Sequence, residues 1–266
     1  MILGILSGKG GVGKTTVVSN LATVLSKALG KSVIIVDSSI TTTSLSHICL
    51  HFGLNENLKE TVRGYLDSKT PLRNVVYTHS PSGVKVIPAP LVLYKQVTPA
   101  GFKKFMKWLS YRGLRKLTQK LEKEYDYVLV DCPPGIGAET VYAIDAIDEA
   151  IVVTTPEIPD VSDALRTINY LKSSNKKIHG VIINKIRNKK YELSINELKE
   201  TFDAPIMSTI GYDDNVPEAI SKGMPSYLHN KNSKVSKEFT RLVGNLTGEE
   251  INIGWWEVMR NFFRFR

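Results

Sequence analysis

Seven short apolar runs, rich in β-branched residues, recur along the chain and alternate with longer segments of helical periodicity. They occupy residues 2–6, 33–36, 84–87, 127–130, 150–154, 181–183 and 206–210. Runs that are apolar almost throughout, rather than at every second position, predict strands that are buried on both faces. The pattern therefore predicts an α/β fold, with a mostly parallel sheet and helices on both of its faces.

The chain length fits one such domain followed by a short tail. The 266 residues can bury one large core but are too few for two domains of this class with linkers. After about residue 248 the composition changes, because aromatic residues and arginines become frequent. We therefore expect one domain over residues 1–248 and an amphipathic tail over 249–266.

A glycine-rich loop follows the first predicted strand and opens a helix. Residues 8–15 satisfy the pattern G-x-x-x-x-G-K-T, and a helical stripe then continues to Gly30, a residue suited to end a helix. Glycines let the backbone N–H groups turn towards phosphates, and the helix N-terminus adds a favourable dipole. Lys14 can reach the β- and γ-phosphates, and the Thr15 hydroxyl can bind Mg²⁺. The segment predicts a P-loop site for ATP and Mg²⁺.

Such a site also needs a carboxylate at the end of a neighbouring strand. Asp131 ends an apolar run and is followed by Cys132-Pro133-Pro134-Gly135. The proline-rich turn releases the chain at the C-terminal edge of the strand, where ligands bind in open α/β sheets. We predict that Asp131 serves the metal together with Thr15.

The net charge bears on the binding partners, and the cysteine and histidine positions bear on disulfides and metal sites. The net charge of +9 favours polyanions, which are either nucleic acid or an anionic membrane surface. Cys49 and Cys132 are far apart, which argues against a disulfide framework, a zinc site or a cluster held within one chain. His47 and His51 lie four residues apart without a third ligand nearby, which is a weak metal signal.

The chain contains no apolar run of transmembrane length, and its N-terminus lacks the basic segment of a signal peptide. We expect a cytoplasmic protein, with peripheral membrane association through the tail described below.

The glycine-rich loop resembles that of the MinD/ParA family of deviant Walker A P-loop ATPases, in which an extra lysine precedes the glycine pair. The resemblance covers about residues 1–245 and rests on residues 7–16, 36–37, 131–135, 155–157, 183–185 and 210–213. The MinD branch is closer, because Ser44-Leu45 and residues 156–158 match its pattern and the Asp-Pro-Gln stretch of ParA is missing. The loop residues expected to bind nucleotide are Gly8, Lys9, Gly10, Gly11, Val12, Gly13, Lys14, Thr15 and Thr16.

The resemblance implies that ATP drives formation of a sandwich homodimer and that a protein activator acts on it. Lys9 would reach the phosphates of the partner and stabilise transition-state charge in trans. Asn184 would hydrogen-bond adenine and the segment at Asp213 would flank the base, although both residues also suit a strand end or a turn. Asp163 matches a family aspartate near the dimer surface; a solvated helix residue is an equal alternative.

One position departs from the family pattern and bears on hydrolysis. The second strand is usually followed by Asp-x-Asp, whose second carboxylate helps to position the attacking water, but this chain has Asp37-Ser38-Ser39. A hydroxyl is a poor general base at neutral pH. Hydrolysis is therefore slow, uses Asp37 or is lost. The predicted catalytic set is Lys9, Lys14, Asp37, Ser39 and Asp131.

The tail carries aromatic and basic residues near helical spacing. This pattern is typical of a helix in a membrane interface with added attraction to anionic lipid, and MinD-like proteins end in a similar helix. Two tails in an ATP dimer would bind more tightly than one. Docking on the protein itself or on a partner is the alternative. The residues expected to contact lipid are Trp255, Trp256, Arg260, Phe262, Phe263 and Arg264.

A second basic segment predicts an amphipathic helix, packed by its aromatic residues, with a solvated cationic face. The alternative is a face that binds DNA without sequence preference, as ParA relatives do, with affinity that falls steeply with salt. Its cations are Lys103, Lys104, Lys107, Arg112, Arg115, Lys116, Lys120 and Lys123.

These features together predict a MinD-like ATPase for spatial positioning, in cell division or related cell organisation, with reversible membrane recruitment. The alternatives are a ParA-like DNA-binding segregation ATPase and a nucleotide-gated adaptor with little hydrolysis. Cluster carriers of the same family are disfavoured, because their paired C-x-x-C cysteines are missing.

Overall fold

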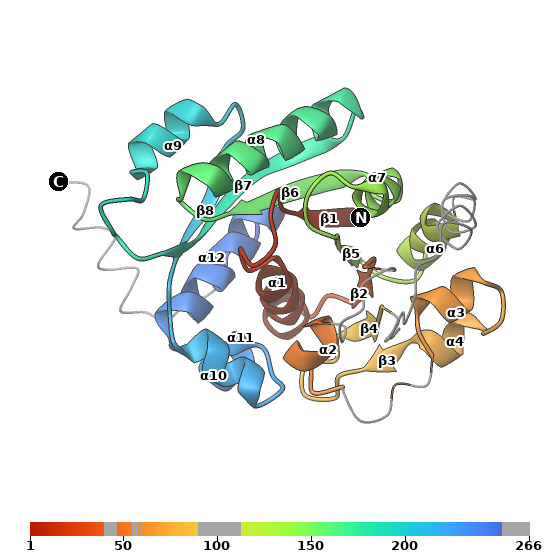
Figure 1. Cartoon of the computed structure of the whole chain (residues 1–266). Coiled ribbons are helices and arrows are strands. Elements are labelled where there is room, and N and C mark those ends of the chain that lie inside the picture. The colour runs from red at the N-terminus through yellow and green to blue at the C-terminus, as the bar shows by residue number, and fades with distance from the viewer. Residues whose placement is uncertain (40–46, 55–57, 59, 90–112, 252–266) are drawn as a thin grey trace, which may run out of the picture.

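The computed structural model describes residues 1–39, 47–54, 58, 60–89 and 113–251. Helices and strands alternate along most of this length (Figure 1). The strands are β1 (Ile2–Leu6), β2 (Val33–Asp37), β3 (Tyr77–Thr78), β4 (Lys85–Ile87), β5 (Tyr127–Asp131), β6 (Glu149–Thr154), β7 (Lys177–Ile186) and β8 (Ile206–Gly211). The helices are α1 (Lys14–Leu29), α2 (His47–His51), α3 (Val62–Leu66), α4 (Leu72–Val75), α6 (Gly113–Glu122), α7 (Ala138–Asp145), α8 (Ile158–Ser173), α9 (Ile195–Thr201), α10 (Asn215–Ser221), α11 (Ser226–His229) and α12 (Lys234–Thr247).

The strands form one eight-stranded sheet in the order β3-β4-β2-β5-β1-β6-β7-β8. The pairs from β4 to β8 are parallel, and β3 alone is antiparallel, to β4. β1 lies between β5 and β6, so the loop that leaves it meets the loops that leave both neighbours. This arrangement confirms the predicted α/β fold and places the glycine-rich loop at the C-terminal edge of the sheet.

The seven predicted strands are all present, with two differences at their margins. β7 extends well beyond the predicted residues 181–183. Its first residues include Lys177 and His179, so they form no apolar run from which the start of the strand could be predicted. β3 was not predicted, since two residues are too short to show a period. Neither difference changes the order of the central strands, on which the site depends.

Alternate residues of each central strand enter two separate cores. In β1, Ile2 and Leu6 face one core, whereas Leu3 and Ile5 face the other. The first core lies under α6, α7 and α8, and the second lies under α1 and α12 (Figure 1). This two-sided burial explains why the strand sequences are apolar almost throughout.

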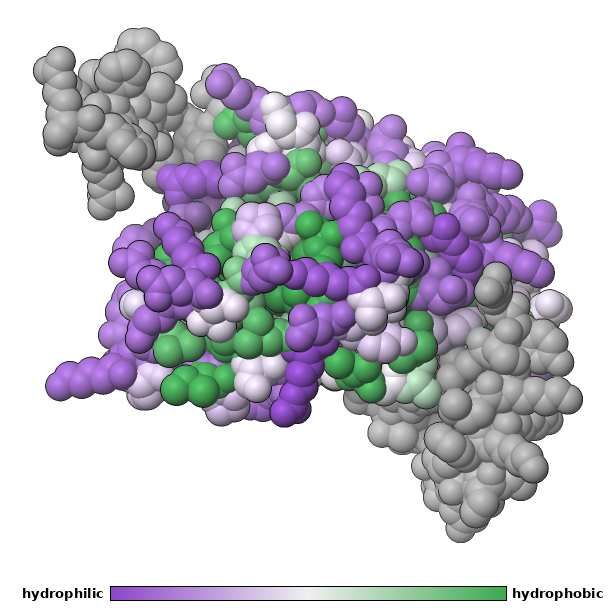
Figure 2. Space-filling view, turned by 90° about the horizontal axis from the view of Figure 1, so that it is seen from above, coloured by the Kyte–Doolittle hydropathy of each residue, from purple (hydrophilic) through white to green (hydrophobic). Residues whose placement is uncertain are grey.

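The helical layers turn polar residues outward. Figure 2 shows one face of the molecule, on which hydrophilic residues surround smaller, separate apolar areas. Over the part of the chain that the structure describes, no helix combines the length and apolar character needed to cross a bilayer.

Several predictions fall on residues outside the described ranges. They are Ser44-Leu45, the cations Lys103, Lys104, Lys107 and Arg112, and the lipid-contact residues from Trp255 to Arg264. The described part of the second basic segment is α6, which packs through Leu114, Leu117 and Leu121. Its first cation, Arg115, pairs with Asp148 at 2.7 Å.

The helix α12 ends at Thr247, one residue before the predicted domain boundary, which stays a prediction. Gly248 follows this helix in the left-handed region, at φ 71°, and its N–H bonds to the carbonyl of Gly244. Glycine adopts this conformation without steric cost, which is why it ends helices. Whether residues 249–266 form a separate amphipathic tail stays a prediction.

Candidate nucleotide site

The glycine-rich loop runs from β1 to α1 and depends on glycine at two positions. Gly11 and Gly13 have φ of 85° and 94°, in the region that side chains rarely adopt. A Cβ on Gly13 would lie 2.2 Å from Asn184 Nδ2, whereas a Cβ on Gly11 would meet no atom within 4 Å. The loop therefore abuts β7 at Gly13 and borders open space at Gly11.

The first turn of α1 is open to a ligand. Gly13 is the N-cap and offers no side chain to bond the N–H groups that begin the helix. These groups border a pocket of about 390 Å³ that is lined by residues 10–16 of the loop and by Asp37, Ser39, Asp131 and Lys185. Open N–H donors, the helix dipole and a nearby lysine are the features that bind phosphate.

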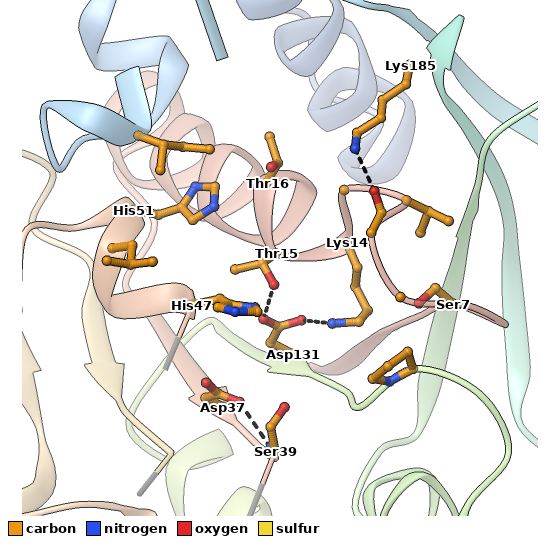
Figure 3. Close-up of a pocket in the computed structure, with 17 residues that line it drawn as sticks. Ser7, Lys14, Thr15, Thr16, Asp37, Ser39, His47, His51, Asp131 and Lys185 are labelled. Carbon is orange, nitrogen blue, oxygen red and sulfur yellow. Dashed lines mark hydrogen bonds and ion pairs between the residues drawn. The ribbon is translucent and has the colours of Figure 1, made fainter. Parts of the chain in front are cut away.

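Lys14, Thr15 and Asp131 converge in this pocket, as Figure 3 shows. The Lys14 ammonium donates to Asp131 Oδ1 at 2.6 Å, and the Thr15 hydroxyl donates to Asp131 Oδ2 at 2.8 Å. Burial alone would lower the pKa of Lys14, but the Asp131 carboxylate outweighs it and holds that pKa above its usual value. Lys14 is therefore charged, and the lone pairs of the Thr15 hydroxyl remain available to a cation.

The carboxylate of Asp37 lies at the end of the neighbouring strand β2. Asp37 and Asp131 are register partners in the β2–β5 ladder, and both are buried. Asp37 Oδ1 accepts the N–H of Ser39 at 3.0 Å, while the Ser38 hydroxyl donates to the carbonyl of Asp131 at 2.9 Å. Asp37 and Ser39 both line the pocket, so the predicted switch residues do reach the site.

Lys9 contacts an aspartate that the sequence analysis did not identify. Its ammonium donates to Asp160 Oδ1 at 2.7 Å, and Asp160 also accepts the Thr155 hydroxyl at 2.7 Å. These bonds raise the pKa of Lys9 above its usual value. The matched family aspartate, Asp163, instead pairs with Arg166 at 3.2 Å. No local sequence signal marks Asp160, because it meets Lys9 only where the first turn of α8 packs beside the loop.

Asn184 and Lys185 link the loop to the end of β7. The Asn184 amide donates to the carbonyl of Val12 at 2.8 Å, and the Lys185 ammonium donates to the carbonyl of Gly11 at 2.5 Å. Lys185 has φ 58°, a conformation that is uncommon outside glycine. Both residues also line a second pocket of about 250 Å³, together with Tyr212 and Asp213. The adenine contact of Asn184 stays a prediction.

Asp213 lies at the far side of the second pocket, where it joins two helices. Its Oδ1 accepts the N–H of Asn215 at 2.9 Å, and its Oδ2 accepts the N–H of Val235 at 3.3 Å. Partial burial by itself raises the pKa of Asp213, but these bonds and the Asn215 amide outweigh it and hold the pKa below its usual value. This bonding fits the turn position that was the alternative for Asp213.

The two histidines of α2 also line the first pocket, although their spacing had given only a weak metal signal. Among the described residues, no group of three or more histidine, cysteine or acidic side chains could hold a metal ion by itself. Both cysteines are buried, and burial raises the pKa of the Cys132 thiol to about 12. That thiol is therefore protonated near neutral pH.

Taken together, the two pockets fit a nucleotide with Mg²⁺. The open helix turn and Lys14 suit phosphates, Thr15 with Asp131 offers oxygen ligands to a hard cation, and the second pocket is large enough for a base. Lys185 lines both pockets and marks where they meet.

Comparison with known proteins gives the same assignment over most of the chain. A model of the ParA family, described as the NUBPL iron-transfer P-loop NTPase, matches residues 1–247. An uncharacterized ATP-binding protein of Methanocaldococcus jannaschii is 33% identical, with 92% of this chain and 87% of that protein covered. The septum site-determining protein MinD of Thermotoga maritima is 30% identical, with 94% and 89% covered.

A solved structure supports the match at the level of the fold. The septum site-determining protein MinD of Pyrococcus horikoshii, complexed with Mg-ADP, superimposes with a TM-score of 0.79 at 27% identity. The alignment covers 92% of this chain and 95% of that one.

Proposed function

Because this chain belongs to the ParA family of P-loop NTPases and is similar over its length to proteins named MinD, we propose that it is a MinD-type ATPase. It binds ATP with Mg²⁺, dimerises on the nucleotide and serves spatial positioning, in cell division or related cell organisation. The observation that carries this proposal is the convergence of Lys14, Thr15 and Asp131 beside the open first turn of α1.

Each residue of this group has a distinct role when nucleotide is bound. Lys14 turns from Asp131 to the phosphates, and the loop N–H groups hold the phosphate oxygens. Thr15 and Asp131 hold the magnesium ion, which neutralises phosphate charge. Titration with a fluorescent ADP tests this directly: we expect binding that strengthens with Mg²⁺ and weakens strongly in Lys14→Ala, whereas equal binding by that variant would contradict the proposal.

The rate of hydrolysis depends on Asp37, because Ser39 supplies no carboxylate. Ser39 nevertheless lies in the pocket with its N–H on Asp37, which favours slow turnover or a nucleotide-gated adaptor. Phosphate release by the wild type and by Ser39→Asp separates these possibilities. Faster release in Ser39→Asp supports a slow ATPase that lacks its second carboxylate; no release by either chain supports the adaptor.

Dimerisation places a second copy against the exposed edge of the loop. Lys9 has a side chain that is 53% exposed, and the nearby start of α8 exposes Ile158 at 63%. An exposed apolar residue beside a half-exposed cation suits a surface that is covered by a partner. Light scattering should give a dimer with ATP and Mg²⁺ and a monomer with ADP; a monomer under both conditions would contradict this part of the proposal.

Membrane recruitment rests on the sequence of the tail. A chain ending at Ile251 is the suitable truncation, because Glu249 pairs with Lys31 at 2.9 Å and Ile251 packs on the core. We expect the full chain to sediment with anionic vesicles in ATP and the shortened chain not to do so. Equal sedimentation of the two chains would show that the tail is not the membrane contact.

DNA binding is the second candidate, and α6 with the turn that follows it offers three exposed cations. They are Lys116 and Lys120 of the helix and Lys123 just after it. A gel shift that weakens steeply with salt would favour this function over membrane recruitment. Iron transfer, which the family description names, does not carry over, because the chain has only Cys49 and Cys132, and both are buried.

A further inference from the structure

His51 combines burial with a place in the nucleotide pocket. It is the last residue of α2, is 6% exposed and lines the pocket together with Thr15 and Asp131. Figure 3 shows it above Thr15, with Asp131 below that threonine. A polar ring that is buried in this place needs hydrogen-bond partners.

One ring nitrogen of His51 has its partner, which is the hydroxyl of Ser19. His51 Nδ1 lies 3.0 Å from the Ser19 hydroxyl. The single proton of that hydroxyl is donated to the carbonyl of Thr16, also at 3.0 Å. We assign Nδ1 as the donor to Ser19, because that hydroxyl can give its one proton to the Thr16 carbonyl; in this tautomer Nε2 carries the lone pair.

The other nitrogen has no hydrogen bond within the described part of the chain. Burial lowers the pKa of His51 to about 4, so the ring is neutral near pH 7 and Nε2 is a lone-pair acceptor. An acceptor that is left unpaired in a buried place costs free energy unless a ligand or a water donates to it.

We propose that His51 is a further positioning residue of the nucleotide site, whose Nε2 accepts a hydrogen bond from a water molecule bound to the magnesium ion. The inference rests on the proposed binding of Mg²⁺ and nucleotide. Mg²⁺ keeps several of its waters in protein sites, and those waters are strong donors. Imidazole is a poor direct ligand for Mg²⁺, so a contact through water suits this side chain. His51 thus adds an acceptor to a site whose second carboxylate is replaced by Ser39.

Two substitutions separate this role from a purely structural one. In His51→Asn the amide reaches the position of Nδ1, so the bond to Ser19 is kept and the pocket acceptor is lost. In His51→Gln the amide oxygen reaches the position of Nε2, so the acceptor is kept and the bond to Ser19 is lost. The measured quantity is the gain in affinity for fluorescent ADP when Mg²⁺ replaces EDTA.

We expect that gain to fall about three- to tenfold in His51→Asn and to stay within about twofold of wild type in His51→Gln. The reverse order would overturn the proposal, because it would mean that only the bond to Ser19 matters. Wild-type protein that binds no ADP in either condition would instead overturn the proposed function itself.

His79 supplies a matched control outside the site. It is also buried, its Nδ1 lies 2.7 Å from the Ser82 hydroxyl, and its pKa is lowered to about 4. His79→Asn should leave the magnesium-dependent gain unchanged; an equal loss there would mean that any buried-histidine substitution perturbs the pocket, and would overturn the proposal.

Long-range ¹H–¹⁵N spectra of the histidine rings give a readout that needs no turnover. For His51 near pH 7 we expect a protonated Nδ1 and an unprotonated Nε2 whose shift changes when Mg²⁺ is added to the ADP complex. A protonated Nε2, or an Nε2 shift that ignores Mg²⁺, would overturn the proposal.

Discussion

The two ends of the nucleotide cleft are built in different ways. At the phosphate end, Lys14 and Thr15 are neighbours in the chain and both bond to Asp131 across the β1–β5 ladder. At the base end, Asn184 and Asp213 come from different elements and bond to backbone groups of the loop and of two helix starts.

The side chains at the phosphate end therefore act on the ligand, whereas those at the base end hold the surrounding backbone in place. The side chains of the phosphate end bond to one another and carry charge, so substitution there removes binding energy and also leaves a charge unpaired. The side chains of the base end act on neutral backbone groups, whose individual bonds contribute about 1 kcal/mol. Substitutions at the two ends should therefore differ in size, and the following experiments test that difference.

Asp131→Asn should have the largest effect. It leaves the buried ammonium of Lys14 without its carboxylate, and breaking a buried pair costs about 3 kcal/mol or more. We expect the free energy of unfolding, measured in urea at pH 7, to fall by that amount. The pKa of Lys14 is raised from 10.5, so the contribution of its charge is still complete at pH 7 and is lost only as the pH rises through the raised pKa.

A double-mutant cycle provides the control for Asp131. In a Lys14→Met background the charge is absent, so Asp131→Asn should cost much less. Equal costs in the two backgrounds would show that the two side chains are not coupled, and would remove the contrast between the two ends.

Lys14→Ala should weaken nucleotide binding about a hundredfold, because charge-assisted bonds to phosphate contribute about 1.5–3 kcal/mol each. Calorimetry with ADP and Mg²⁺ measures the change. Lys185→Ala is the matched control, since this lysine touches the same loop through a carbonyl and is partly exposed. We expect less than about a fivefold loss there, and similar losses in both variants would contradict the special role of Lys14.

Asn184→Ala should weaken ATP binding about five- to tenfold, through the lost bond to the carbonyl of Val12 and the predicted contact with adenine. Parallel titrations with ATP and GTP separate these two causes. A larger loss for ATP than for GTP is expected if Asn184 contacts the base. Equal losses of affinity for ATP and GTP would show that Asn184 only supports the loop through its bond to Val12.

Asp213→Asn should have the smallest effect, about 1 kcal/mol of unfolding free energy at pH 7. The pKa of Asp213 is lowered, so its charge stabilises the fold above the unfolded pKa near 4, and this contribution is lost as pH falls below that value. The difference between wild type and variant should therefore shrink by pH 3. Asp214→Asn is the control, because that N-cap residue makes no capping bond.

Much of the phosphate end was predictable because its residues lie in one short motif. The motif at residues 8–15 predicts both the backbone conformation and the side-chain chemistry of the loop. The apolar strand that ends in Asp131 predicts the carboxylate on the metal side of the site. The base end was predicted only through family resemblance. Its residues are separated along the chain, and nothing local distinguishes Asn184 or Asp213 from an ordinary strand end or turn.

The contacts of Lys9 and His51 were not predictable from local sequence. Lys9 meets Asp160 only because α8 begins beside the loop, and His51 meets Ser19 only because α2 packs on α1. The sequence analysis had weighed His51 as a metal ligand by its spacing from His47, whereas its role in the pocket depends on a hydroxyl 32 residues away.

By itself, the sequence determined the α/β class, the phosphate loop, the metal-side carboxylate and the missing second carboxylate at Ser39. The first three follow from local patterns, because strand burial, loop conformation and residue chemistry are set by residues that are near one another in the chain. The missing carboxylate at Ser39 became visible only through the family resemblance. The tertiary structure alone decided the partner of Lys9, the contact of His51 with Ser19 and the support of the loop by Asn184. Those depend on distances between elements, and such distances are fixed only when the two cores pack against the sheet.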